Sequence, residues 1–129
     1  MTDGPMNTLL VDDTPINVKL LSALLKANGF AVTIATTGEA ALELFGQAEF
    51  GLILLDLRLP GIDGLTVARK VRADPRPHRP LIVAVTASAM KTDVAAALEA
   101  GCDAFISKPI NTRTLIPTLQ DLLARHRPA

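Results

Sequence analysis

Apolar segments recur along the chain, and each is followed by a stretch with helical spacing. The segments cover residues 8–11, 31–35, 52–55, 81–85 and 104–107. Leu52 to Leu55 form an unbroken apolar run that leads directly into Asp56 and then into turn residues. This pattern is typical of a strand buried on both faces of a sheet. Segment 31–35 alternates apolar and small residues, which indicates a half-buried edge strand.

The first helix is expected to begin at Thr14-Pro15 and to run to about residue 28. Threonine caps helix N-termini well, and proline at the first helical position loses no needed hydrogen bond. One apolar stripe of this helix contains Ile16, Leu20, Ala23, Leu24 and Ala27, and the opposite stripe contains Val18, Leu21 and Leu25. Because one stripe is enough to cover the sheet, the other is left for a different contact.

Further helices are expected over residues 38–47, 64–73, 91–100 and 112–125. Thr36 or Thr37 would cap the first of these. Pro117 falls inside the last one and predicts either a local kink or a later start.

Strand and helix alternate five times along the chain. This alternation predicts an α/β fold with a parallel sheet and helices on both of its faces. Right-handed crossovers leave few topologies, and the natural one is a flavodoxin-like doubly wound (βα)5 sheet with strand order 2-1-3-4-5. We expect one domain over residues 7–126, a disordered tail over 1–6 and a C-terminal tail over 127–129.

Composition narrows the possible functions. The 129 residues suit a single domain with its own core. Thirteen basic and thirteen acidic residues give no net positive field, and Trp and Tyr are absent, so nucleic acid is not an expected partner. No apolar run approaches the roughly 20 residues of a membrane span. One cysteine and the lack of a signal-peptide pattern indicate a cytoplasmic protein.

Chemically active side chains follow four of the five predicted strands. Asp12 and Asp13 follow the first strand, Asp56 the third, Thr86 the fourth and Lys108 the fifth. In doubly wound sheets the carboxyl ends of the strands meet in one crevice, where ligands bind. We therefore expect these side chains to lie together.

Three carboxylates in one crevice repel each other unless a cation joins them. Oxygen ligands favour a hard ion such as Mg2+. A divalent ion, a lysine and a threonine hydroxyl around one carboxylate would stabilise a phosphoryl group in transfer. Asp56 is the candidate nucleophile, and Asp12 and Asp13 are the candidate metal ligands.

With these residues at these positions, the chain closely resembles the receiver domains of two-component response regulators. The resemblance rests on Val11-Asp12-Asp13, on Asp56 with Leu59-Pro60-Gly61-Ile62-Asp63-Gly64, on Val85-Thr86-Ala87 and on Ile106-Ser107-Lys108-Pro109. It extends over essentially the whole chain and is strongest to the stand-alone, DivK-like single-domain regulators.

The resemblance implies a phosphoacceptor and a metal site. Asp56 would accept the phosphoryl group and would also belong to the metal site, and Asp13 would bind Mg2+ directly. Asp12 would either bind the metal through water or support the directly bound ligands, and the backbone carbonyl of Arg58 would supply a further protein ligand.

The resemblance also implies a switch. Thr86 would hydrogen-bond the phosphoryl group, Lys108 would pair with it, and Phe105 would be the aromatic switch residue. The Lys108–Pro109 peptide bond is typically cis in this family. Ser88 occupies a variable position that influences phosphoryl lifetime.

The implied partners are a sensor histidine kinase or a histidine phosphotransfer protein, together with a downstream protein target. Phosphorylation would change the surface of the fourth helix, fifth strand and fifth helix, where a homodimer is also possible. The stripe Val18, Leu21 and Leu25 would contact the helical bundle that carries the donor histidine. Such a regulator is not an enzyme, because it assists only its own phosphorylation and dephosphorylation.

Two other functions are considered. A haloacid-dehalogenase-like phosphatase also has an aspartyl nucleophile but needs an aspartate two residues later, where this chain has Arg58. A flavin-binding flavodoxin-like module needs a phosphate loop after the first strand, where Asp12-Asp13 would repel phosphate. Whether the chain stands alone or is excised from a hybrid kinase stays open, although the initial Met favours a complete protein.

Other polar residues are assigned ordinary roles. Asp63 and Asp93 are expected in helix caps or first turns, and Cys102 as a small structural residue. His78 and His126 are expected in solvent, as is the basic set Arg69, Lys70, Arg72, Arg76 and Arg79.

Overall fold

The computed structural model describes residues 6–76, 79–87 and 91–126. The strands are β1 (Met6–Val11), β2 (Phe30–Ala35), β3 (Leu52–Asp56), β4 (Leu81–Thr86) and β5 (Ala104–Ser107). The helices are α1 (Pro15–Ala27), α2 (Gly38–Gln47), α3 (Gly64–Ala73), α4 (Lys91–Glu99) and α5 (Leu115–Arg125). The expectations for His78, Ser88, residues 127–129 and most of the N-terminal tail fall outside the described residues.

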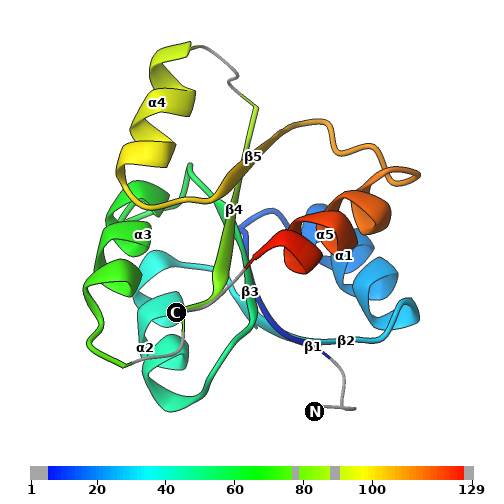
Figure 1. Cartoon of the computed structure of the whole chain (residues 1–129), viewed down its shortest axis with the longest axis horizontal. Coiled ribbons are helices and arrows are strands. Elements are labelled where there is room, and N and C mark those ends of the chain that lie inside the picture. Colours follow the sequence, from blue (N-terminus) through cyan, green and yellow to red (C-terminus); the bar gives the residue numbers. More distant parts are fainter. Residues whose placement is uncertain (1–5, 77–78, 88–90, 127–129) are drawn as a thin grey trace.

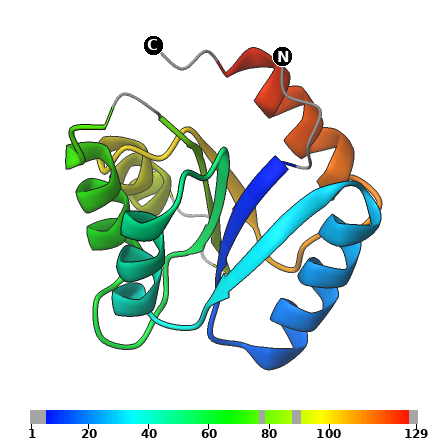
Figure 2. The same ribbon diagram turned by 90° about the horizontal axis from the view of Figure 1, so that it is seen from below.

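The strands form one parallel sheet in the order β2-β1-β3-β4-β5, which confirms the predicted topology. Helices α2, α3 and α4 cover one face of the sheet, and α1 and α5 cover the other (Figures 1 and 2). None of the described helices has both the length and the apolar character that crossing a membrane requires.

The central strand β3 divides its side chains between two cores. Ile53 and Leu55 belong to the core under α2, α3 and α4, whereas Leu52 and Leu54 belong to the core under α1 and α5. All four are essentially inaccessible to solvent. A strand covered on both faces needs an apolar residue at every position, which explains the unbroken run in the sequence.

Several element boundaries differ from those expected. Strand β1 begins at Met6, so this residue pairs with Phe30 of β2 instead of belonging to a tail. Helix α5 begins at Leu115, with Thr114 at its N-cap position, so Pro117 lies in the first helical turn. No backbone N–H is needed there for an intrahelical bond, and the predicted later start is confirmed.

The assignment of the two stripes of α1 was wrong. Leu21 and Leu25 are buried against the sheet, and Val18 packs beside them. Ile16 and Leu20 of the opposite stripe are 75% and 50% exposed, respectively. Both stripes are apolar, so the spacing alone could not decide which way the helix is rotated.

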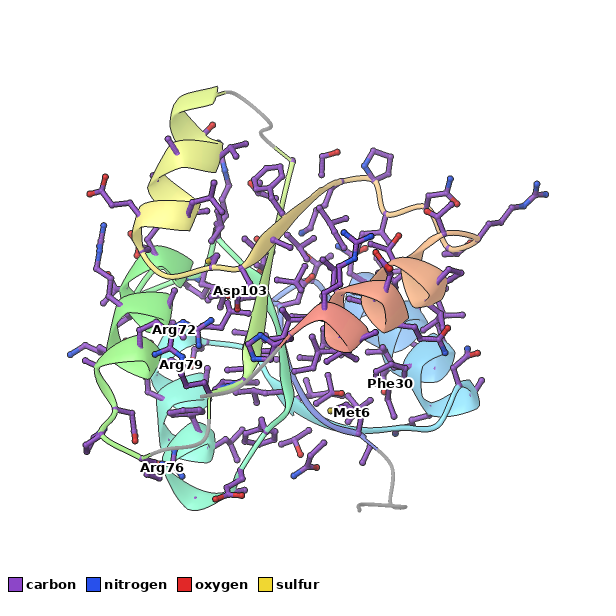
Figure 3. All side chains as sticks on the ribbon, viewed as in Figure 1. Met6, Phe30, Arg72, Arg76, Arg79 and Asp103 are labelled. Atoms are coloured by element: carbon purple, nitrogen blue, oxygen red, sulfur yellow. The ribbon has the colours of Figure 1, made fainter. Side chains whose placement is uncertain are left out.

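The prediction of a solvated basic face was wrong for Arg72. Its Nε and Nη1 donate hydrogen bonds to the carbonyl oxygens of Gly101 (2.8 Å) and Pro80 (2.9 Å). Its Nη2 pairs with the carboxylate of Asp103, which also accepts the amide of Ile82 at 2.9 Å. Figure 3 shows Arg72 and Asp103 between α3 and β5. Burial lowers the pKa of Arg72, and the charge of Asp103 opposes this effect.

Two other residues expected in solvent also have partners. Arg76 donates to the carbonyl oxygen of Phe45 at 2.7 Å, and its guanidinium lies 4.6 Å from the centre of that ring. His126 Nε2 lies 2.8 Å from the carbonyl oxygen of Arg79. Both contacts join segments distant in sequence, which residue type and spacing do not reveal.

The predicted helix caps are largely confirmed. Thr37 Oγ1 accepts the amide of Ala40 at 3.0 Å, and Asp63 Oδ1 accepts the amide of Thr66 at 2.8 Å. Asp93 lies in the first turn of α4. Cys102 is buried, as expected of a structural residue, and burial raises the pKa of its thiol to about 11.

Candidate functional site

Three carboxylates meet at the carboxyl edge of the sheet. Asp56 is the last residue of β3, and Asp12 and Asp13 follow β1 directly. Asp12 and Asp56 are almost completely buried, whereas Asp13 is exposed. One carboxylate oxygen from each residue lies within 4.8 Å of the others. The topology thus brings together acids that are more than forty positions apart.

The two buried carboxylates are held in the same way. Oδ1 of Asp12 accepts the amide of Thr14 at 2.8 Å, and Oδ1 of Asp56 accepts the amide of Arg58 at 2.9 Å. Oδ2 of each residue faces the ammonium group of Lys108, at 3.7 Å from Asp12 and 2.9 Å from Asp56. Each carboxylate therefore has one oxygen on the backbone and one beside a positive charge.

Lys108 reaches this pocket from the end of β5. Its backbone amide donates to the carbonyl oxygen of Thr86 at 2.8 Å, and the Lys108–Pro109 peptide bond is cis. Burial alone would lower the pKa of Lys108. The hydrogen bond to Asp56 and the charges of Asp56 and Asp12 outweigh burial, so the pKa is raised and the ammonium form is favoured.

The other residues singled out from the sequence lie around this pocket. Thr86 is buried at the end of β4 and pairs with Ser107 of β5. Arg58 is exposed and lines, with Thr86, a cavity of about 150 Å³ between the β3–α3 loop and α4. Phe105 is half-buried and packs against the core under α2, α3 and α4.

The donor set fits a hard divalent cation. Lys108 offsets only one of three neighbouring negative charges, so the pocket favours a further cation. All three acids offer oxygen, which is the ligand type that Mg2+ prefers. Oxygens on opposite sides of one Mg2+ are about 4.2 Å apart, so small side-chain rotations or a bridging water would bring the three carboxylates around one ion.

An apolar cleft of about 410 Å³ opens beside the lysine. Its walls include Asn17, Leu20 and Leu21 from α1 and Lys108, Pro109 and Ile110 from the segment after β5. The exposed stripe of α1 and the acidic pocket are therefore continuous along one surface.

The sequence did not indicate how the carboxylates are oriented. Thr14 was expected to cap α1, but within the described part of the chain its side chain makes no capping hydrogen bond. Its backbone amide holds Asp12 instead. An amide two residues after an aspartate is a common partner for the carboxylate, and this spacing is a weak signal that could have suggested the contact.

The fold and the site define a doubly wound α/β protein with an acidic, lysine-containing pocket at the carboxyl edge of its sheet. The family model of the response regulator receiver domain matches residues 8–120. The chain belongs to this family of two-component signalling proteins, whose members are regulators and in which a phosphoacceptor role is general.

Two curated relatives differ greatly in length. The polar-differentiation response regulator DivK of Brucella anthropi is 35% identical over 119 residues, covering 92% of this chain and 97% of DivK. The aerobic respiration control sensor protein ArcB of Escherichia coli is 40% identical over 111 residues, covering 85% of this chain and 14% of ArcB. The match thus spans nearly all of one relative and a small part of the other.

Solved structures share the fold. The receiver domain of the sensor histidine kinase PA1611 from Pseudomonas aeruginosa has a TM-score of 0.85 and 32% identity, covering 94% of this chain and 99% of its own. That structure has a magnesium ion coordinated in its active-site cleft. A putative response regulator from Chloroflexus aurantiacus has a TM-score of 0.87 and 31% identity, with the same coverage of 94% and 99%.

Proposed function

We propose that this receiver domain accepts a phosphoryl group on Asp56 from a sensor histidine kinase or a histidine phosphotransfer protein. The contact of Lys108 with Asp56 at 2.9 Å, beside two further acids, is the observation that carries the proposal. Asp13, Asp12 and the backbone carbonyl of Arg58 would hold Mg2+. The bound ion would neutralise charge on the carboxylates and on the incoming phosphoryl oxygens.

The carboxylate geometry suggests which oxygen reacts. Among the described residues, Oδ1 of Asp56 accepts a hydrogen bond from the backbone amide of Arg58, while Oδ2 accepts one from the ammonium group of Lys108, whose long side chain can rotate away. Oδ2 would attack phosphorus as the P–N bond of the donor phosphohistidine breaks, and the leaving imidazole nitrogen would take up a proton. Lys108 would then move from Oδ2 to a phosphoryl oxygen, which keeps its charge paired.

The new phosphoryl group would bias a switch. Thr86 would turn its hydroxyl toward a phosphoryl oxygen, and half-buried Phe105 would move further inward. Thr86 lies beside α4 and β5, and Phe105 belongs to β5, so the surface of α4, β5 and α5 would change. Leu98 on α4 is 52% exposed, which supports a downstream protein target, or a second copy of the chain, on this surface.

The donor would approach along α1. Ile16 and Leu20 are exposed, and the cleft between α1 and Pro109–Ile110 leads to Lys108. An apolar helix face beside the pocket suits a helical bundle that carries a phosphohistidine. With these partners, the phosphoryl transfer would take place in the cytoplasm.

Phosphorylation by acetyl phosphate tests the assignment. The wild-type protein with Mg2+ should gain one acid-labile phosphoryl group in intact-mass spectra, and Asp56→Asn should gain none. Asp121→Asn, which changes an exposed carboxylate on α5, should behave like wild type. Labelling of Asp56→Asn equal to wild type would refute the assignment, and steady turnover of p-nitrophenyl phosphate would favour a phosphatase instead.

A further inference from the structure

The loop between β3 and α3 carries Arg58 and is fastened at both ends. At its start, the amide of Arg58 donates to Oδ1 of Asp56 at 2.9 Å. At its end, the amide of Gly64 donates to the carbonyl oxygen of Leu57 at 3.2 Å. A methyl group at Gly64 would lie 2.5 Å from the carbonyl oxygen of Asp56. The start of α3 is therefore packed directly on the backbone that carries the phosphoacceptor.

A third contact comes from α2, which carries neither the three acids nor the lysine of the described pocket. Gly38, its first residue, is buried against the loop. A Cβ atom at position 38 would lie 2.4 Å from the carbonyl oxygen of Ile62 and 3.1 Å from Cγ2 of Val67. Real Cβ atoms essentially never approach a backbone oxygen as closely as this Ile62 carbonyl, so any side chain at position 38 would force the two backbones apart.

The helix is less free to move than the loop. Thr37 caps the first turn of α2 through the amide of Ala40, and Ala41 and Phe45 are buried in the core. In the loop, Leu59 and Ile62 pack against this core only as partly buried side chains, and Pro60 and Gly61 are exposed. Helices α2 and α3 lie side by side on this face of the sheet (Figures 1 and 2). A side chain at position 38 would therefore displace mainly the loop. The displaced residue, Ile62, is only four positions from Arg58.

We propose that Gly38 is a positioning residue for the metal site. Because glycine has no side chain, the carbonyl of Ile62 can pack against the first turn of α2 at Gly38. This packing sets the position of the loop and hence of the Arg58 carbonyl. This inference rests on the proposed function, in which that carbonyl is a metal ligand. The packing on α2 acts on the ion only through the loop.

The test is Gly38→Ala, with Gly46→Ala as a matched control. Both glycines lie in α2, and a Cβ atom at position 46 would have nothing within 4 Å. Alanine is favoured over glycine by about 1 kcal/mol in a helix interior and by less at the ends, so helix propensity gives neither variant a reason to lose stability. Isothermal titration with Mg2+ should show affinity about 10-fold weaker for Gly38→Ala, the usual scale for residues that support ligands. Gly46→Ala should bind Mg2+ like wild type.

A second control separates positioning from general destabilisation. Ile116→Val weakens the opposite core by about 1 kcal/mol and should leave Mg2+ affinity unchanged. Titrations are made at a temperature at which circular dichroism shows every variant folded. If Gly38→Ala binds Mg2+ as tightly as wild type, the inference is overturned. If the wild-type protein itself binds no Mg2+, the metal site of the proposed function is refuted, and the inference about Gly38 is refuted with it.

The wild-type protein provides a measurement that needs no variant. In amide NMR spectra, Mg2+ should shift the resonances of Gly38 and Ile62 with the same midpoint as those of Asp13 and Arg58. The resonance of Gly46, farther along α2, should stay in place. If the Gly38 resonance is unmoved while that of Arg58 shifts, α2 does not sense the site and the inference is wrong, whether or not Gly38→Ala folds.

Discussion

The ammonium group of Lys108 lies 2.9 Å from Oδ2 of Asp56, and the same group lies 3.7 Å from Oδ2 of Asp12. One ammonium group thus forms ion pairs with two buried carboxylates, which lie at the ends of different strands. Each carboxylate keeps its other oxygen on a backbone amide. The lysine and a divalent ion would therefore neutralise the same pair of charges, which makes stability, metal binding and phosphorylation interdependent.

Replacing Lys108 with methionine should lower the free energy of unfolding in metal-free buffer. The loss should be about 2 kcal/mol, less than for a fully buried pair, because the side chain is 19% exposed. The pKa of Lys108 is raised in the folded state by Asp56 and Asp12, despite the opposing effect of burial. Its stabilising contribution is therefore complete below the ordinary value of 10.5 and is lost as the pH rises through the raised pKa.

Urea denaturation of wild type and Lys108→Met at pH 8, 9.5 and 11 checks this prediction. Groups that titrate equally in both proteins cancel in the difference between them. The difference should be constant at the two lower pH values and smaller at pH 11. A difference that increases toward pH 11 would contradict the sign of the pKa shift.

Asp13→Asn should make the protein slightly more stable without metal and insensitive to Mg2+. The carboxylate of Asp13 is exposed and lies near two buried acids, so its removal relieves repulsion worth about 0.5 kcal/mol. Wild type should gain about 1.4 kcal/mol from Mg2+ at ten times the dissociation constant. Thermal melts in EDTA and in Mg2+ measure both effects. Asp121→Asn should keep the full gain, and an equal gain in Asp13→Asn would remove Asp13 from the ligand set.

Arg72→Met should destabilise the protein by about 3 kcal/mol, because it removes three hydrogen bonds and leaves Asp103 without its cation. Arg72→Lys should recover only part of this loss, since an ammonium group cannot match the planar fork of a guanidinium. Arg69→Met, on the exposed side of the same helix, should change stability little. Urea denaturation compares the three variants, and similar losses for Arg69→Met and Arg72→Met would show that the Arg72 contacts contribute nothing.

The fold could be predicted because the apolar strands and the alternation of strands and helices indicate the same architecture. Strands covered on both faces are apolar up to their last residue, as in β3 and β4, and the alternation of strands and helices allows few topologies. That topology places the carboxyl ends of β1, β3 and β5 together. The proximity of Asp12, Asp56 and Lys108 follows from it without any knowledge of side-chain geometry.

Side-chain contacts across elements could not be predicted in this way. Arg72 has the residue type of a surface position, and only the approach of Pro80 and Gly101 makes it a partly buried donor. The rotation of α1 depends on which of two apolar stripes packs better, a difference that periodicity does not contain. The close approach of Gly38 to Ile62 is likewise a property of two packed backbones and not of either segment alone.

The corrected rotation of α1 leads to a prediction about the phosphoryl donor. Leu20→Ala should slow phosphotransfer from a phosphorylated histidine kinase or phosphotransfer protein by about 10-fold, because Leu20 is half exposed on the cleft beside Lys108. Phosphorylation by acetyl phosphate should be unchanged, since that donor is too small to contact α1. Leu98→Ala, on α4, removes a similarly exposed side chain and should leave both rates unchanged. A Leu20→Ala protein that lost both rates equally would indicate damage to the pocket instead of a docking surface, and one that lost neither would remove α1 from the interface.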